Sequence, residues 1–423
     1  MTVEVLLTIK QGTLRGVREH GCIAFHGVPY ASSGGRFKPC HPPLSIGDDE
    51  VFDATKSGPS FPQMTMRGGA LGDYEEELNQ AEDAFIASIW TPDLDGRLPV
   101  VIWVHGGGWM SGSGQTPSCS GREIASTGRC VFVTINYRLS CLGTIAPEDD
   151  LGGNHSIRDI LAAFTWVRKN IARFGGDPDK LVLAGQSAGA GFVAQLLGAP
   201  CLAGQIHRAA LFSLPGDLEF MSAEDAGRIK AKLLDRLGAA SLAEIADLPA
   251  NKLIAAMPPA MPSPIYEEGF FDWPTVDGAA SVSGASVPIF IGCTADEVAF
   301  FLPPKMRNAP EYWDIVAKGT KEGFWDGCNR LASAFEGAGG QAYVYRFARP
   351  SQIEHLRACH CSELPYLFGN LDQWNDAPLL KGVDEGEFAE LSGRFQGAFL
   401  DFVCGKAPWE EFDGTDSSIE LFE

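Results

Sequence analysis

One serine with small neighbours stands between two segments of different pattern. Residues 185–189 read Gly-Gln-Ser-Ala-Gly, with the serine at Ser187. The apolar run 181–184 predicts a strand buried on both faces, and the apolar spacing after Ala188 predicts a helix. A serine on such a sharp strand-to-helix turn presents its hydroxyl as a nucleophile, next to helix N–H groups that face an oxyanion. In another context the same residues would be a glycine-rich turn without chemistry, so the flanking elements favour the nucleophile.

Strand and helix patterns alternate along the rest of the chain, which predicts a mostly parallel sheet with helices on both faces. We expect a single α/β domain over residues 1–423, with a helical insertion or lid region at about 215–270. The segments predicted are a strand pair over 3–17, strands over 98–105, 130–136, 287–292 and 342–347, helices over 157–174 and 222–237, and a proline-rich loop over 258–264.

Composition and charge restrict the partners of the protein. The chain has 423 residues, 45% of them hydrophobic, and a formal net charge of −21. This charge repels nucleic acids and anionic membranes, so we expect neither as a partner. The sequence has no apolar stretch of about 18 residues and no basic leader followed by an apolar core, so we expect no membrane-spanning helix and no secretory signal.

Cysteine usage indicates a reducing compartment. The chain has eleven cysteines, an odd number that lacks the regular spacing of a disulfide framework. A chain of this length builds a large core and does not need disulfides to fold. We therefore expect eleven free thiols and a cytoplasmic protein.

A series of short motifs runs in a fixed order through nearly the whole chain. The motifs are FHGVPYA at 25–31, RF at 36–37, ED at 82–83, WTP at 90–92, HGGG at 105–108, NYRL at 136–139, FGGDP at 174–178 and HCSELPYLFG at 360–369. The series resembles that of the type-B carboxylesterases, the α/β-hydrolase family that includes bacterial carboxylesterases and the cholinesterases. The resemblance implies an α/β-hydrolase fold and hydrolysis of carboxylic esters through an acyl-enzyme, without a metal or an organic cofactor.

The resemblance implies that an acid and then a histidine follow the serine in the chain. His355 and His360 both come after a candidate acid, and His360 lies in a motif similar to that of the family, with Cys361 where a glycine is usual. Asp296 and Glu297 directly follow a predicted strand, which is where a triad acid belongs. The resemblance selects His360 and Glu297, and it leaves Asp296 to bond loop backbone groups.

The resemblance also implies an oxyanion hole made by the N–H groups of Gly107, Gly108 and Ala188. Trp109 and Gln186 are the expected substrate-pocket residues. Gln186 stands where many relatives carry glutamate, so the site should be less negative, and nothing indicates a cationic substrate.

Two charged pairs implied by the resemblance should tie loops to the core: Arg36 with Glu82, and Arg138 with Asp159. They belong to the fold rather than to the chemistry. The cysteines on either side of His360 suggest a metal site, but no second pair stands at ligand spacing, so we expect no metal.

The expected activity is that of a serine carboxylesterase acting on small-molecule esters. Segments that form the walls of the site in large members of the family are shorter here, which predicts an open site that accepts bulky esters. The same residues also support hydrolysis of an amide, a carbamate or a thioester. A non-catalytic, esterase-like binding protein is the alternative of another class, and such members typically lack a triad residue. The sequence leaves the oligomeric state undetermined.

Overall fold

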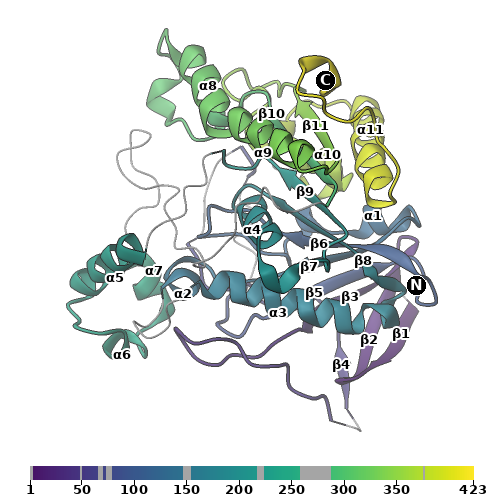
Figure 1. Cartoon of the computed structure of the whole chain (residues 1–423). Helices are drawn as coiled ribbons and strands as arrows, with labels where there is room; N and C mark the ends of the chain where they lie inside the picture. The colour runs from purple at the N-terminus through teal and green to yellow at the C-terminus, as the bar shows by residue number, and fades with distance from the viewer. Residues whose placement is uncertain are drawn as a thin grey trace.

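One continuous sheet runs through the molecule, and helices lie on both of its faces (Figure 1). The structure is a computed structural model and describes residues 3–47, 50–64, 70–72, 79–145, 154–216, 223–257, 287–374 and 377–423. Within these residues the sheet has twelve strands in the spatial order β1-β2-β3-β5-β7-β6-β8-β9-β10-β11-β12, with β4 paired to β2. The strands are β1 (Val3–Ile9), β2 (Gly12–Glu19), β3 (Cys22–Pro29), β4 (Val51–Asp53), β5 (Ile86–Thr91), β6 (Leu98–Val104), β7 (Val131–Ile135), β8 (Gly176–Gln186), β9 (Arg208–Phe212), β10 (Ile289–Thr294), β11 (Ala342–Phe347) and β12 (Glu420–Phe422).

The sheet has an antiparallel part and a parallel part. The pairings from β1 through β2, β3 and β5 to β7 are antiparallel. Every pairing from β7 through β6, β8, β9, β10 and β11 to β12 is parallel. Strands β7 and β10 are buried along their whole length, because helices cover both faces of a parallel sheet. The predicted mostly parallel sheet is confirmed, and the predicted N-terminal strand pair forms its antiparallel edge.

Helices cover both faces of the sheet. In the view of Figure 1, α3 and α4 lie in front of the central strands. On the opposite face, Phe395 and Phe399 of α11 pack against Phe212 of β9 and Phe290 of β10, with ring centroids 5.6 to 6.4 Å apart. The helices of the described residues are α1 (Arg122–Ser126), α2 (Ser140–Thr144), α3 (His155–Asn170), α4 (Ala188–Leu197), α5 (Ala223–Leu237), α6 (Leu242–Ile245), α7 (Ala250–Ala256), α8 (Tyr312–Thr320), α9 (Asp326–Gly337), α10 (Leu364–Phe368) and α11 (Glu385–Val403).

The helix expected over 157–174 is shorter than predicted. Helix α3 begins after Asn154, whose side chain accepts a hydrogen bond from the N–H of Ile157, and it ends at Asn170. A 3₁₀ turn (Ile171–Phe174) follows and stops at Gly175, which has a φ of +78°. Glycine adopts this left-handed conformation without a steric penalty, so the turn can lead directly into β8.

Helices α5, α6 and α7 lie within the region where the insertion was expected. Their apolar side chains form a hydrophobic cluster separate from the main core, in which Leu233, Ile245 and Leu253 are buried together with Leu142 of α2. Part of the insertion expected at about 215–270, including the start predicted for its first helix at residue 222, and the whole proline-rich loop expected over 258–264 lie outside the described residues.

The two charged pairs expected to tie loops to the core are present. Arg36 is paired with Glu82 and also donates a hydrogen bond of 2.9 Å to the carbonyl oxygen of Ala246, after α6. Arg138 is paired with the buried Asp159 at 2.7 Å. Each of the eleven cysteines is a free thiol, as predicted. Among the described residues, no helix combines the length and the apolar character that crossing a bilayer requires.

Candidate active site

Ser187 lies on the turn between β8 and α4, in a strained backbone conformation with φ 54° and ψ −125°. Two neighbours must be glycine, because the turn crowds the backbone around it. A Cβ atom on Gly185 would lie 2.6 Å from the carbonyl carbon of Gly189, and one on Gly189 would lie 2.1 Å from the carbonyl oxygen of Val104. The turn therefore holds the serine at the carboxyl ends of the parallel strands, with the first turn of α4 beneath it.

Glu297 and His360 form a buried contact at the same edge of the sheet. Oε2 of Glu297 is hydrogen-bonded to Nδ1 of His360, and Oε1 accepts from the N–H of Thr294 at 2.7 Å. Glu297 is fully buried, and 2% of His360 is exposed. Burial by itself lowers the pKa of His360, but the contacts with Cys361 and Glu297 outweigh it and raise that pKa well above 6.5.

The two rejected candidates lie apart from this contact. Asp296 accepts a hydrogen bond of 3.2 Å from the N–H of Ala358, so it bonds loop backbone as expected. His355 is half-buried and borders a separate cavity of about 340 Å³, and its carbonyl oxygen accepts from the hydroxyl of Tyr312 at 2.6 Å. His355 therefore lies at the surface, partly covered by neighbouring side chains, and takes no part in the contact with Glu297.

Ser187 and His360 line one cavity of about 390 Å³. Most of its wall is apolar or aromatic, and the described lining residues include no Asp, Glu, Lys or Arg. Among the predicted site residues, those that also line it are Gly107, Gly108, Trp109 and Gln186. Ala188 is buried at the start of α4, directly after the serine, and Glu297 lies behind His360.

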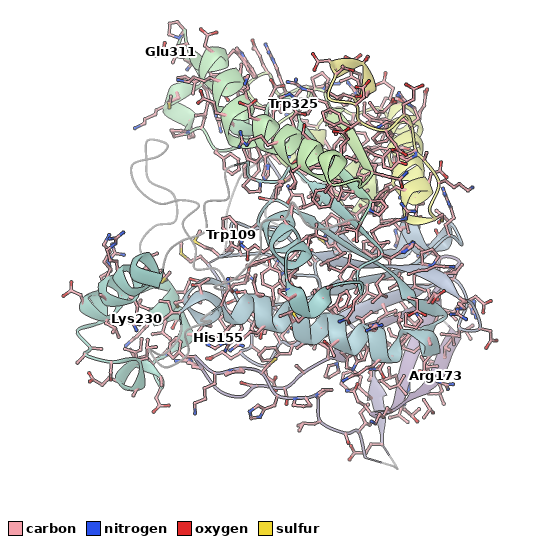
Figure 2. All side chains as sticks on the ribbon, in the orientation of Figure 1. Trp109, His155, Arg173, Lys230, Glu311 and Trp325 are labelled. Carbon is pink, nitrogen blue, oxygen red and sulfur yellow. The ribbon has the colours of Figure 1, made fainter. Side chains whose placement is uncertain are left out.

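The glycine loop after β6 has a backbone that few other residues can adopt. Gly107 has a φ of +116°, and a Cβ atom there would lie 2.1 Å from the carbonyl oxygen of Ser111. Gly108 and Trp109 also have positive φ values of 59°. The buried ring of Trp109 packs edge-on against Phe192 of α4, and Figure 2 shows Trp109 inside the molecule beside this helix.

Gln186 has a more specific position than the sequence indicated. Its Nε2 atom lies 3.3 Å from Nε2 of His360 and donates a 3.2 Å hydrogen bond to Sγ of Cys361. In the described part of the chain, the structure records no hydrogen bond between Ser187 and His360. Contacts of this kind are often loose before a substrate binds.

Sequence reasoning missed the aromatic wall around the histidine and a buried acid behind it. The rings of Phe300, Phe301 and Phe324 have centroids 5.0 to 5.7 Å from that of His360. The first two closely follow Glu297 in the chain, a proximity that was available as a signal. Glu363 is fully buried, and its Oε1 accepts a 2.9 Å hydrogen bond from the hydroxyl of Ser213.

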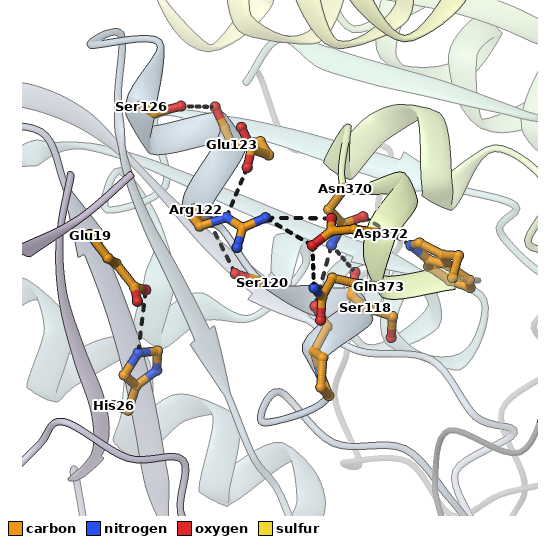
Figure 3. A network of polar contacts seen from close by, with 12 residues as sticks. Glu19, His26, Ser118, Ser120, Arg122, Glu123, Ser126, Asn370, Asp372 and Gln373 are labelled. Carbon is orange, nitrogen blue, oxygen red and sulfur yellow. Dashed lines mark hydrogen bonds and ion pairs between the residues drawn. The ribbon is translucent and has the colours of Figure 1, made fainter. Parts of the chain in front are cut away.

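A polar network connects Ser118 and Arg122 to Asn370 and Asp372 (Figure 3). Ser118 and Trp374, which this network holds, line the cavity. The side-chain amide of Asn370 donates to the carbonyl oxygen of Ser118 at 3.1 Å and accepts from Nε1 of Trp374 at 2.9 Å. Arg122 of α1 is paired with Asp372 at 3.4 Å. These contacts join a segment after β6 to a segment after α10, so the cavity wall depends on residues far apart in the chain.

Known proteins are similar to this chain in sequence. The model of the carboxylesterase family matches residues 3–321. The chain is 30% identical to a probable N-octanoylanthranilate hydrolase of Rhodococcus erythropolis, over 94% of this chain and 92% of that protein. It is also 30% identical to the para-nitrobenzyl esterase of Bacillus subtilis, over 94% of this chain and 89% of that protein. The chain belongs to the carboxylesterase family.

The fold of this carboxylesterase agrees with that of solved relatives. It matches the crystal structure of the carboxylesterase of Geobacillus stearothermophilus with a TM-score of 0.81 and 30% identity, over 99% of this chain and 93% of that chain. The esterase therefore has the α/β-hydrolase fold and is a carboxylic ester hydrolase. Its described residues contain no group of three His, Cys, Asp or Glu side chains placed to hold a metal ion.

Proposed function

We propose that Ser187, His360 and Glu297 are the catalytic triad. The observation that carries this proposal is that a serine on a strained turn and a buried histidine–carboxylate contact converge on one apolar cavity. Nε2 of His360 takes the proton of Ser187 while Oγ attacks the ester carbonyl carbon, and it then protonates the alcohol that leaves. A water hydrolyses the acyl-enzyme by the same proton transfers, while Glu297 orients the imidazole and stabilises its charged form.

The oxyanion of each tetrahedral intermediate would bind to the N–H groups of Gly107, Gly108 and Ala188. Both glycines have positive φ values and line the cavity together with Ser187, and Ala188 contributes the first N–H of α4. Hydrogen bonds from such donors stabilise the transition state because the charge develops there and not in the substrate.

Ser187→Ala tests the proposal directly. The variant should lose about 10⁴-fold or more in kcat, because triad residues act as a unit. A serine-directed phosphonate should label the wild type at Ser187, as peptide mass spectrometry would show, and it should not label the variant. Ser417→Ala, at an exposed position near the C-terminus, is the matched control. A Ser187→Ala enzyme with near wild-type turnover would disprove the mechanism.

We further propose that the substrates are neutral esters, including esters of bulky alcohols. The described lining of the cavity has no Asp, Glu, Lys or Arg to pair with a charged group. Gly107 and Gly108 leave free the space above the serine, where a branched alcohol group must sit in the tetrahedral intermediate.

Cleavage of tert-butyl acetate, compared with n-butyl acetate, tests this preference, with Ser187→Ala as the blank. Both esters should be hydrolysed, and Trp109→Ala should raise the rate on the bulkier one, because the indole lines the cavity. Rapid cleavage of the linear ester without detectable cleavage of the tertiary ester would contradict the proposal.

Amide hydrolysis is the second candidate, because the same triad supports it and one relative is named as the hydrolase of an N-octanoyl compound. A comparison of kcat/KM for an octanoyl ester and the matching octanoyl anilide would decide between them. The proposed compartment is the cytoplasm, supported by eleven free thiols. Fractionation of the source cells, with detection by antibody, tests this placement.

A further inference from the structure

The side chains of Gln186 and Cys361 meet beside the histidine. Gln186 directly precedes the serine and Cys361 directly follows His360, at the two positions where the resemblance led us to expect a glutamate and a glycine. The two residues are far apart in the chain, yet Nε2 of Gln186 donates to Sγ of Cys361 at 3.2 Å. The same amide nitrogen lies 3.3 Å from Nε2 of His360, and all three side chains line the cavity.

The chemistry of the amide determines how it meets the imidazole. A carboxamide –NH2 group donates hydrogen bonds and does not accept them. It therefore pairs with an Nε2 atom that carries no proton, while the Glu297 carboxylate keeps the proton on Nδ1 of the same ring. We infer that Gln186 and Cys361 are positioning residues that hold the His360 ring and oppose the protonation of its Nε2 atom between turnovers.

The inference rests on the proposed roles of Ser187 and His360 and adds a resting state to them. Between turnovers the Gln186 amide donates a hydrogen bond to Nε2 of His360. When the ester enters, the hydroxyl of Ser187 replaces the amide as the donor to Nε2. Once His360 has taken the serine proton, its Nε2–H group faces the amide –NH2 group, and two donors do not pair. This arrangement favours prompt transfer of the proton to the leaving alcohol.

Other titratable groups near the ring also act on its charge. Glu297 stabilises the imidazolium from the Nδ1 side. Burial raises the pKa of the Cys359 and Cys361 thiols, so both are neutral around pH 7. Burial, followed by the charge of Glu297, raises the pKa of Glu363 to about 7. The aromatic rings that cover the remaining sides carry no charge, so the donor at Nε2 is a direct influence on that atom.

Gln186→Glu tests the inference, because it replaces the donor by a carboxylate that accepts from a protonated Nε2. The acid limb of the kcat/KM profile should move up by about one pH unit or more, as for other opposite charges in contact. Activity below the limb should fall about tenfold and should return at alkaline pH. The rate of inactivation by a serine-directed phosphonate should shift in the same way without any substrate.

Gln205→Glu is the matched control. It adds the same charge at a half-buried position that does not line the cavity, where the side chain of Gln205 accepts from Arg168 at 2.7 Å. Its acid limb should stay at the wild-type pH. An unchanged limb in Gln186→Glu, or an equal shift in the control, would overturn the inference; the first result would mean that the amide does not present a donor to Nε2.

Cys361→Gly provides a second test that does not depend on the folding of Gln186→Glu. Cys361 has a φ of +71°, which glycine adopts freely, so this variant should fold. Because the Cys361 thiol is neutral, its loss removes no charge beside the ring, but it leaves the Gln186 amide without its sulfur acceptor. Nε2 should then gain a proton more readily, so the acid limb should move to higher pH, in the same direction as in Gln186→Glu. Cys361→Ser should restore the limb, because a hydroxyl also accepts from the amide.

A Cys361→Gly profile identical to that of the wild type would overturn the role of the pair, whether or not Gln186→Glu folds. The proposed function fails by a different result, because an active Ser187→Ala enzyme would disprove the triad whatever the two pH profiles show. Exposed Cys201→Ser is the control for loss of a thiol elsewhere, and it should leave the profile unchanged.

Discussion

Asp296 and Glu297 are adjacent in the chain, but their carboxylates bind to different parts of the site. Oε2 of Glu297 contacts Nδ1 of His360, whereas Oδ2 of Asp296 accepts from the N–H of Ala358 at 3.2 Å. The N–H of Asp296 in turn donates to the carbonyl oxygen of Ala358 at 2.9 Å. Asp296 thus fixes the segment that leads to the histidine, and Glu297 contacts the histidine itself.

Because the two carboxylates have different partners, two conservative substitutions should have very different effects. Glu297→Gln should lower kcat by about 10⁴-fold, because an amide neither stabilises the imidazolium nor fixes the tautomer of His360. Asp296→Asn should leave kcat within about tenfold, because its amide oxygen still accepts from Ala358, and should cost roughly 1 kcal/mol of unfolding free energy. Steady-state kinetics and denaturant unfolding measure the two effects. Equal losses of kcat in the two variants would refute the assignment of the acid.

Glu363 predicts a pH dependence of stability. Burial and then the charge of Glu297 raise its pKa from 4.5 to about 7. Between these two values the folded protein keeps a proton on Glu363 that the unfolded chain has lost. The free energy of unfolding therefore falls as pH rises through this window, by on the order of 3 kcal/mol in total.

Glu363→Gln removes this titration while it keeps an oxygen that accepts from Ser213. From pH 5 to pH 8 the free energy of unfolding of the variant should therefore fall less than that of the wild type. Denaturant unfolding of both proteins at the two pH values measures the difference. Glu390→Gln, on the exposed side of α11, should follow the wild type at both. If Glu363→Gln shows the pH dependence of the wild type, the buried acid is not protonated in the folded protein.

A side chain at Gly107 should lower the activity, because the backbone of Ser111 lies too close to leave room for a Cβ atom. In Gly107→Ala the new Cβ atom would lie 2.1 Å from the carbonyl oxygen of Ser111, so the backbone of the loop must shift and its N–H groups move from their positions. We expect kcat to fall by about 10²-fold or more, as when an oxyanion donor is lost. Gly128→Ala is the matched control, since Gly128 has a φ of +78° with no atom within 4 Å of the added Cβ.

The control should keep its kcat and lose about 1 to 2 kcal/mol of stability from backbone strain alone. Kinetics and thermal unfolding of both variants separate strain from close approach. Similar losses of kcat in both would show that a left-handed conformation, and not the crowding around Gly107, limits activity.

The sequence by itself determined the local features of this protein. The apolar run before Ser187 and the small residues around it predicted a strand, a sharp turn and a helix, because burial periodicity and backbone crowding are properties of neighbouring residues. The motif series predicted the family and the fold. His360 and Glu297 were selected by resemblance, and the structure brings these two side chains together.

The tertiary structure decided which distant side chains meet. The contact of Gln186 with Cys361, the hydrogen bond of Ser213 with Glu363 and the aromatic ring of Phe324 against His360 have no signature in the sequence. Each joins segments that lie side by side only because of the order of the strands in the sheet and the packing above their carboxyl ends. Sequence periodicity reports which face of an element is buried, but not what lies opposite that face, so only the folded chain specifies these contacts.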